Sequence, residues 1–341
     1  MTQQLDHIVK IANWAVGDRP LRDAADGTGF AGPGLVAAIG NFDGVHKGHQ
    51  QVIAAAGSAA HAAGLLPAVV TFDPHPREFF RHDETPFRLT DRREKDRLLT
   101  DILGPMGPAR IIHVAFDERL RRTEADEFVT SILHDLGVRQ LLAGRDFAFG
   151  KDRSGDIDTI NKVGAAVGIT ASPVSLLTDE NSAVISSSRV RAALQAGTPD
   201  AAAAMLGRDW AVTGTVIRGD ARGRTIGFPT ANIALGGLQH PAFGVYAVEI
   251  DCDDGAAAPR PIGVGVANIG IRPTVADRGV LCEAHLFDQQ IDLYDKRLMV
   301  RLKAFLRPER KFAAIEDLIQ QIEIDAAAAR AMLPKQAAGQ S

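Results

Sequence analysis

The chain has 341 residues, of which 45% are hydrophobic, and this is enough for two domains with substantial cores. Its 38 basic and 42 acidic residues give a net charge of −4, and only 6% of the residues are aromatic, which argues against a general nucleic-acid-binding protein. The two cysteines, Cys252 and Cys282, are too few for a disulfide framework, which predicts a reducing, cytoplasmic environment.

Residues 1–34 form a lead-in before the first strongly apolar run. Within it, residues 5–16 predict a short amphipathic helix, and the Gly- and Pro-rich stretch 27–34 predicts a loop. The lead-in holds four aspartates and no apolar core typical of a signal peptide, and no run in the chain is long enough to cross a membrane. We therefore expect neither secretion nor a membrane partner, and we assign residues 1–34 no role.

From residue 35 to about residue 175, apolar runs alternate with longer amphipathic stretches. The expected strands are 35–39, 66–72, 111–116, 140–143 and 169–174, and the expected helices are 50–63, 92–103, 123–136 and 156–167. Alternation at this spacing is typical of a parallel sheet with helices on both faces. Two short helices, 186–195 and 199–206, complete an α/β, Rossmann-like N-terminal domain over residues 35–207.

The first of these strands runs into the sequence GNFDGVHKGH, residues 40–49, and then into a helix. A Gly-rich turn between strand and helix presents backbone N–H groups and the positive end of the helix to an anion. Gly40 and Gly44 permit close backbone approach, and His46 and His49 share one face once the chain coils. Two imidazoles there can stabilise charge on a reacting phosphate. The alternatives are half of a metal site and an ordinary pair of surface histidines.

Three further motifs follow in this half. TFDPHP, residues 71–76, places Asp73 and His75 at the carboxyl end of a strand, where open α/β sheets bind ligands; a rigid turn is the alternative. GRDFAFGKDRSGD, residues 144–156, combines aromatic and basic side chains, a set that suits a planar ligand carrying phosphate. ISSSRVR, residues 185–191, offers a serine cap and two arginines that can reach phosphate oxygens, or else an ordinary capped helix.

After residue 207 the sequence changes to short β-type runs separated by Gly, Pro and Asp. These runs predict a small antiparallel β-barrel within residues 208–341, with strands at 210–217, 245–250, 262–266, 281–287 and 298–305. Residues 314–333 predict a terminal helix with one apolar face.

The sequence GDARGRTIGFPTAN, residues 219–232, is the most distinctive motif of the second half. Gly219 and Gly227 lie in a flexible loop, and arginines within it add positive charge. Thr230 and Asn232 present oxygens on one side of an extended chain. Neutral oxygens together with substrate phosphates suit Mg²⁺, so we expect a magnesium–nucleotide site here.

Glu283 lies in an alternating run, CEAHL, at residues 282–286. If its carboxylate points inward beside this loop, it can act as a general base on a hydroxyl. An outward-facing surface glutamate is the alternative.

These motifs, in this order, resemble those of the prokaryotic bifunctional riboflavin kinase/FMN adenylyltransferase, also called FAD synthetase. GNFDGVHKGH, TFDPHP, FAFGKDRSGD and ISSSRVR are similar to its adenylyltransferase module, and RGRTIGFPTAN, GVYAV, ANIGIRPT and FLRPERKF to its kinase module. The resemblance covers about residues 35–333. It implies an adenylyltransferase domain at residues 35–207 and a riboflavin kinase domain at 208–341, after the lead-in 1–34.

The resemblance also implies substrates and residue roles. Riboflavin and ATP would give FMN, and FMN and ATP would then give FAD and pyrophosphate, with Mg²⁺ as the metal and no protein partner. His46 and His49 would contact the ATP phosphates, and Glu283 would be the kinase base. The other implied binding residues, toward nucleotide or flavin, are Gly40, Asn41, Phe42, Asp43, Gly48, Ser187, Ser188, Arg191, Gly219, Arg224, Gly227, Thr230, Asn232, Arg272 and Thr274, and the metal would lie on Thr230 and Asn232.

The sequence departs from the family pattern in two places. Ala148 stands where many members carry arginine between the two phenylalanines, and Gln290 and Asp295 stand where glycine is often found. The alternatives are a monofunctional riboflavin kinase with a degenerate adenylyltransferase module, a non-catalytic flavin or nucleotide sensor, and an RNA-binding barrel. The intact histidine pair and Glu283 argue against the sensor, and the negative net charge argues against RNA.

Overall fold

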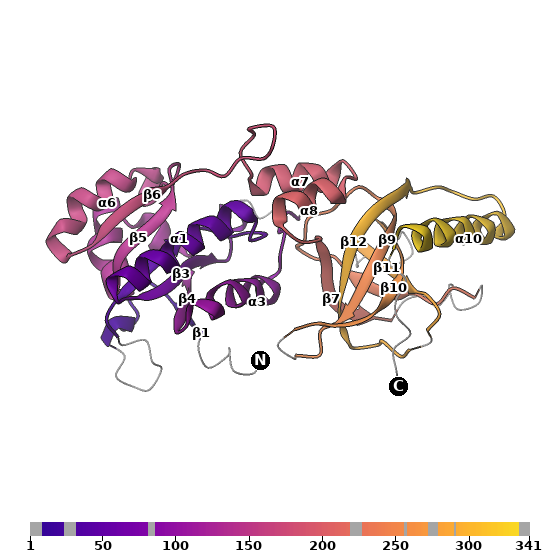
Figure 1. The fold of residues 1–341 in the computed structure, drawn as a ribbon, viewed down its shortest axis with the longest axis horizontal. Helices are drawn as coiled ribbons and strands as arrows, with labels where there is room; N and C mark the ends of the chain where they lie inside the picture. The colour runs from indigo at the N-terminus through magenta and orange to yellow at the C-terminus, as the bar shows by residue number, and fades with distance from the viewer. Residues whose placement is uncertain are drawn as a thin grey trace. The chain divides into compact units, whose positions relative to one another are not determined.

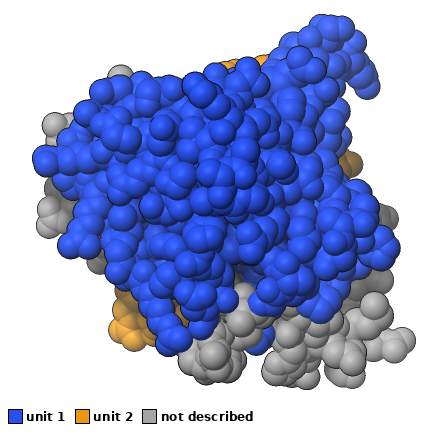
Figure 2. Space-filling view, turned by 90° about the vertical axis from the view of Figure 1, so that its left-hand side faces the viewer, with its two compact units in different colours: residues 1–85, 92–185 blue, residues 86–91, 186–341 orange. Residues whose placement is uncertain are grey.

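The computed structural model describes residues 9–23, 32–80, 86–218, 227–255, 258–271, 279–289 and 291–333 (Figure 1). The chain divides into two compact units, which Figure 2 colours separately. The first unit consists of residues 1–85 and 92–185, and the second of residues 86–91 and 186–341. The first unit therefore contains chain from both sides of residues 86–91, which themselves belong to the second unit.

The first unit is built on a six-stranded sheet in the order β1-β4-β3-β2-β5-β6. All five pairings are parallel, as the alternating sequence predicted. The strands are β1 (Val9–Trp14), β2 (Leu35–Ile39), β3 (Leu66–Asp73), β4 (Ala109–Ala115), β5 (Val138–Gly144) and β6 (Thr170–Val174). From β2 the chain continues to β3 and β4 on one side, whereas β5 and β6 lie on the other, so the topological switch point lies beside β2.

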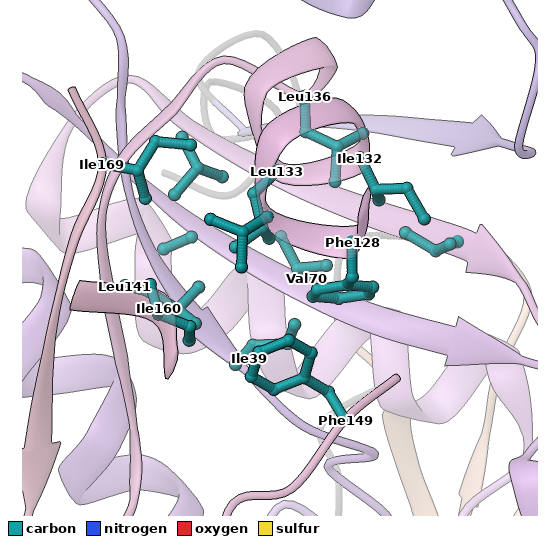
Figure 3. Packing of buried hydrophobic residues seen from close by; sticks show 14 of the residues in the cluster. Ile39, Val70, Phe128, Ile132, Leu133, Leu136, Leu141, Phe149, Ile160 and Ile169 are labelled. Carbon is teal, nitrogen blue, oxygen red and sulfur yellow. The ribbon is translucent and has the colours of Figure 1, made fainter. Parts of the chain in front are cut away.

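Helices cover both faces of this sheet. One buried core joins Val36, Val69 and Ile111 of the strands to Ile53 of α1 (Lys47–Ala63) and Leu99 of α3 (Arg92–Leu103). On the opposite face, alternate strand residues pack against the segment around Phe128, as Figure 3 shows for Ile39 and Val70. The helical segments are α1 (Lys47–Ala63), α2 (Pro76–Phe80), α3 (Arg92–Leu103), α4 (Glu118–Arg122), α5 (Ala125–Glu127), a π-helix (Phe128–Leu133) and α6 (Ile157–Gly164), with 3₁₀ turns at Leu21–Asp23, Gly104–Met106, Lys151–Arg153 and Ala165–Val167.

The structure corrects the sequence prediction for the lead-in. Its described part forms strand β1 instead of a helix, and β1 pairs in parallel with β4 from Val9 opposite Ala109 to Trp14 opposite Val114. A short apolar run fits either period, and the free edge of β4 supplies the backbone partners that decide between them. The lead-in, to which the sequence assigned no role, thus contributes a strand to the sheet.

The second unit contains the predicted antiparallel barrel, closed in the order β10-β11-β8-β7-β12-β9. Its strands are β7 (Ala211–Ile217), β8 (Ala231–Ala234), β9 (Gly244–Cys252), β10 (Arg260–Ile271), β11 (Val280–Leu286) and β12 (Arg297–Pro308). The unit also holds α7 (Ser187–Gln195), α8 (Pro199–Leu206) and the terminal α10 (Ile315–Met332). Helix α10 buries Ala329 against Val245, Ala247 and Val266 of β9 and β10.

Residues 86–91 are an integral part of this second unit. The indole N–H of Trp210, a ring that is only 1% exposed, donates to the Leu89 carbonyl at 2.7 Å. The Thr213 hydroxyl donates to Asp91 at 2.7 Å, and Arg297 forms an ion pair with the same carboxylate. The barrel unit is therefore completed by a segment that precedes α3 in the sequence.

Candidate active sites

The turn between β2 and α1 lies at the topological switch point and is anchored by side chains in the core. Strand β2 is buried along its whole length, and Phe42 and Val45 of the turn belong to the core beneath α1. The backbone of Phe42 (φ 48°), Gly44 (φ 80°) and Val45 (φ 42°) is left-handed. Non-glycine residues keep such a conformation only where their surroundings fix it, and this is a common property of functional turns.

His46 is the N-cap of α1. Its Nδ1 accepts the backbone N–H of His49 at 3.2 Å, so the proton of the neutral His46 ring lies on Nε2. The rings of His46 and His49 are stacked, with centroids 3.6 Å apart and planes inclined by 17°, which confirms that they share one face. A Cβ on Gly48 would lie 3.1 Å from Cε1 of His46, so glycine leaves room for this ring.

The same end of α1 is suited to an anion. The helix has 17 residues and no acidic side chain in its first turn, so no carboxylate within that turn opposes the binding of an anion. Asn41 is tied to β3 because its carbonyl accepts the hydroxyl of Thr71 at 3.1 Å. Asp43 is buried in the turn, while Gly40 continues strand β2 through a bond from its N–H to the Val70 carbonyl. The turn can therefore direct two imidazoles and a helix end at one phosphate group.

The other motifs of the first half have mainly structural contacts. Asp73, at the end of β3, pairs with Arg92 at 2.6 Å, and Nδ1 of His75 accepts the backbone N–H of Arg77 at 3.1 Å. Phe149 is 6% exposed and packs on Phe128 at 4.9 Å between ring centroids. The interpretation of Phe149 as a surface for a planar ligand is therefore wrong, because the ring belongs to the core under the π-helix.

The ISSSRVR motif begins helix α7, and its helical residues belong to the second unit. The Ser186 hydroxyl caps the helix by accepting the Arg189 N–H at 3.4 Å, and Ser187 and Ser188 form the first turn. Arg191 donates from Nε to the Phe87 carbonyl at 2.8 Å and lies 5.1 Å over the Phe87 ring. Phosphate binding by Ser187, Ser188 and Arg191 stays a prediction.

In the barrel, three polar residues form a row across neighbouring strands. Glu283 of β11 lies opposite Asn232 of β8 and opposite Asn268 of β10. Directly opposed residues share one face of a sheet. The fully buried Cys282 and Ala284 point to the other face, inside the barrel. The expectation of an inward-pointing Glu283 is therefore wrong: the row lies on the outer face, the one on which α10 packs.

The sequence did not single out Asn268 or Glu309, which lie beside Glu283. The Asn268 amide donates to Glu309 at 3.3 Å. A Cβ on Gly270 would lie 2.1 Å from Oε1 of Glu309, so this glycine leaves the space that the carboxylate occupies. Asn268 and Gly270 alternate onto one strand face within ANIGIRPT, and that spacing beside the Glu283 strand was the available signal.

Further predicted residues of the second half have different outcomes. Gly227 has φ 87°, a left-handed value that suits glycine just before the PTAN element. Nδ1 of His285, one pleat from Glu283, donates to the Pro229 carbonyl at 2.8 Å and so fixes the approach to Thr230. Burial raises the pKa of the Cys282 thiol to about 12, so a thiolate nucleophile is not available beside Glu283. The predicted binding residues Gly219, Arg224, Arg272 and Thr274 lie outside the described residues.

Within the described parts of the chain, no group of three or more His, Cys, Asp or Glu side chains could enclose a metal ion. The donor set on β8 suits another arrangement. The Asn232 amide donates to the Thr230 carbonyl at 3.4 Å, which turns the amide oxygen of Asn232 away from that carbonyl. The Thr230 hydroxyl, the Asn232 oxygen and the nearby Glu283 carboxylate are hard oxygen donors, which fit Mg²⁺ shared with substrate phosphates.

Comparison with known proteins identifies the family of each half of the chain. Residues 31–189 match the family model described as FAD synthetase, and residues 206–333 match the model described as riboflavin kinase. A bifunctional riboflavin kinase/FMN adenylyltransferase from Pseudomonas fluorescens is 43% identical over 301 residues, which cover 88% of this chain and 93% of that protein. The protein of the same description from Escherichia coli K12 is 39% identical over 298 residues, covering 87% of this chain and 92% of that one.

A solved structure shares the whole fold. The crystal structure of a macrolide-efflux protein from Streptococcus pneumoniae matches with a TM-score of 0.76 and 26% sequence identity, over 94% of this chain and 99% of that one. For the present chain, none of the described helices has the length and apolar character that a membrane span requires.

The two family models, which match a parallel-sheet unit and a β-barrel unit, define an enzyme of nucleotidyl and phosphoryl transfer. The chain belongs to the family of bifunctional riboflavin kinase/FMN adenylyltransferases. It phosphorylates riboflavin to FMN with ATP and adenylylates FMN with a second ATP, which gives FAD and pyrophosphate. This agrees with the function that the motifs implied, and it does not favour a monofunctional kinase or a sensor.

Proposed function

We propose that the two reactions are divided between residues 35–207, which carry adenylyl transfer, and residues 208–341, which carry riboflavin phosphorylation. The extents of the two family models, 31–189 and 206–333, support this division. The observation that carries the proposal is the pair of separate polar constellations. One is the stacked histidine pair at the start of α1, and the other is the row on β8, β11 and β10.

In adenylyl transfer, an FMN phosphate oxygen attacks the α-phosphorus of ATP, and the bond to the bridging oxygen of the departing pyrophosphate breaks. The Nε2–H of His46, the stacked ring of His49 and the first N–H groups of α1 stabilise the charge that develops on the phosphate oxygens. Gly40, Asn41, Phe42, Asp43 and Gly48 shape this turn. Positioning and charge stabilisation are sufficient for such a transfer, so no covalent enzyme intermediate is needed.

In the kinase reaction, a riboflavin hydroxyl attacks the γ-phosphorus of ATP, and ADP leaves. Glu283 accepts the hydroxyl proton, and Asn232 beside it holds the nucleotide end of the site together with Thr230. Mg²⁺, when bound, would lie on Thr230 and Asn232 and would neutralise charge on the ATP phosphates. We further propose a cytoplasmic location, which is supported by the use of ATP and by the two buried free cysteines.

The test is incubation of the full chain with riboflavin, ATP and Mg²⁺, with FMN and FAD measured separately over time. We expect His49→Ala to lower FAD formation by about 10²-fold or more while FMN formation persists. Asn232→Ala should lower FMN formation from riboflavin, while FAD formation persists when FMN is supplied. Equal loss of both activities in both variants, with the fold intact, would overturn the division.

A further inference from the structure

A polar layer lies between helix α3 and the carboxyl ends of three strands. Asn13, His113 and Thr71 lie side by side in register on β1, β4 and β3. They share the sheet face that carries Val69 and Ile111, against which α3 packs. The first turns of α3 supply one partner to each of them: Arg92 donates to Asn13, Asp96 pairs with His113 at 2.6 Å, and Nζ of Lys95 donates to Thr71 at 3.3 Å.

The Lys95 contact leads directly into the phosphate turn. The hydroxyl of Thr71, a side chain that is 0% exposed, donates its proton to the Asn41 carbonyl at 3.1 Å. A hydroxyl has one proton and two acceptor sites, so a donor on its other side fixes its direction. The Lys95 ammonium is that donor. The chain of contacts thus runs from α3 through β3 to the first peptide of the turn.

Lys95 also acts on the turn through charge. Burial lowers the pKa of Lys95, while the carboxylates of Asp73, Asp96 and Asp43 act in the opposite direction. Asp43 is itself buried in the turn, two residues after Asn41. Attraction between a poorly solvated ammonium and a buried carboxylate is stronger than between exposed groups. The hydrogen bond to Thr71 is thus the contact that links Lys95 to the turn, and the charge of Asp43 favours the ammonium form of Lys95.

The turn needs such fixation because of its backbone. Phe42 and Val45 have left-handed φ values of 48° and 42°, which are unfavourable for residues other than glycine. The next residue, His46, carries the imidazole that starts α1. A turn that relaxed toward ordinary φ values would move both stacked rings away from the position they occupy.

We propose that Lys95 is a positioning residue for adenylyl transfer, which fixes the 40–46 turn through the Thr71 hydroxyl. This inference rests on the proposed assignment of adenylyl transfer to the His46 and His49 turn. It predicts that removing either Lys95 or the Thr71 hydroxyl misplaces the histidine pair in the same way.

The experiment compares Lys95→Met, Thr71→Val and the double variant, each as the full chain, with Lys162→Met as the control for an exposed lysine on α6. FAD formation from supplied FMN and ATP gives kcat and KM, and FMN formation from riboflavin is measured in parallel. We expect kcat for FAD formation to fall about 10- to 100-fold in each single variant, because small misplacements of reacting groups are costly. The KM values should change less than about threefold, because a residue that only positions the turn leaves substrate binding largely intact.

Three further readouts make the inference falsifiable. The double variant should be no slower than the worse single variant, because the two residues act through one contact. Thr71→Ser, which keeps the hydroxyl, should retain activity, and this serine–valine comparison decides the matter even if Lys95→Met does not fold. The proposal would be overturned if the kcat losses of the two single variants multiplied in the double variant. Full activity of Thr71→Val, or an effect confined to KM, would also overturn it. If His46→Ala also forms FAD normally, the site assignment fails; if only Lys95 and Thr71 prove dispensable, this inference alone fails.

Discussion

One pair of variants distinguishes the helix-capping contact of His46 from its proposed chemical role. Its Nδ1 caps α1 by accepting the His49 N–H at 3.2 Å, whereas the role proposed for its Nε2–H is donation to a phosphate. His46→Ala removes both functions. His46→Asn removes the ring but supplies a side-chain oxygen that can accept the same N–H, and asparagine is among the best N-cap residues.

The magnitudes follow from these contacts. Loss of an N-cap destabilises a protein by about 0.5–2 kcal/mol, so we expect His46→Ala to unfold about 1 kcal/mol more easily than His46→Asn. Both variants lose the ring stack on His49, so the difference between them isolates the cap. Loss of one charge-stabilising donor should slow FAD formation by about 10²- to 10³-fold in both variants.

The assay is FAD formation from FMN and ATP, with FMN formation from riboflavin as the internal control and urea unfolding for stability. FMN formation should stay within about twofold of the unmodified chain in both variants. The polar row of Asn232, Glu283 and Asn268, to which we assign the kinase reaction, does not include His46. If His46→Asn forms FAD at the normal rate, the ring serves only as a helix cap and the chemical role must be abandoned.

Three further predictions concern the second unit. Glu283→Gln should slow FMN formation by about 10²- to 10⁴-fold, mainly in kcat, and leave FAD formation from FMN intact; a change confined to KM would mean that Glu283 only binds the flavin. Trp210→Phe removes the buried hydrogen bond to the Leu89 carbonyl and should destabilise the second unit by about 2 kcal/mol. The kinase activity should then be lost at a lower temperature. An unchanged inactivation temperature would contradict the stabilising role of residues 86–91 in this unit. Asp325→Asn weakens the ion pair with Arg307, at 2.7 Å, that joins α10 to β12. We expect the free energy of unfolding, measured in urea, to fall by about 2 kcal/mol. An unchanged free energy of unfolding would show that the pair is dispensable.

Much of the fold could be predicted because local patterns and long-range packing agree. Strand β2 is apolar throughout since both of its faces are covered, and the Gly-rich turn and helix after it are visible as residue types. The same holds for α3 and for the barrel strands, whose alternation reflects one inner and one outer face. Sequence reasoning missed β8, since four residues are too short for a period to appear.

The remainder depended on partners far away in the sequence. Residues 9–14 are a strand because the edge of β4 is open to them, and nothing within the segment itself chooses strand over helix. Phe149 is a core residue because the π-helix packs on it. Whether Glu283 faced the inside or the outside of the barrel depended on register, since a shift by one residue exchanges the two faces.

The sequence by itself therefore determined the residue types at each site and their order along the chain. It pointed to the histidine pair at a Gly-rich turn before a helix, and to the PTAN element and Glu283 in extended segments, because phosphate transfer needs charge-stabilising groups, oxygen ligands and a base. Only the tertiary structure joined Lys95 to Asn41 through Thr71, and Asn268 to Glu309 beside Glu283. Those contacts connect separate strands, helices and loops, and sheet pairing and core packing alone bring such segments within hydrogen-bond distance.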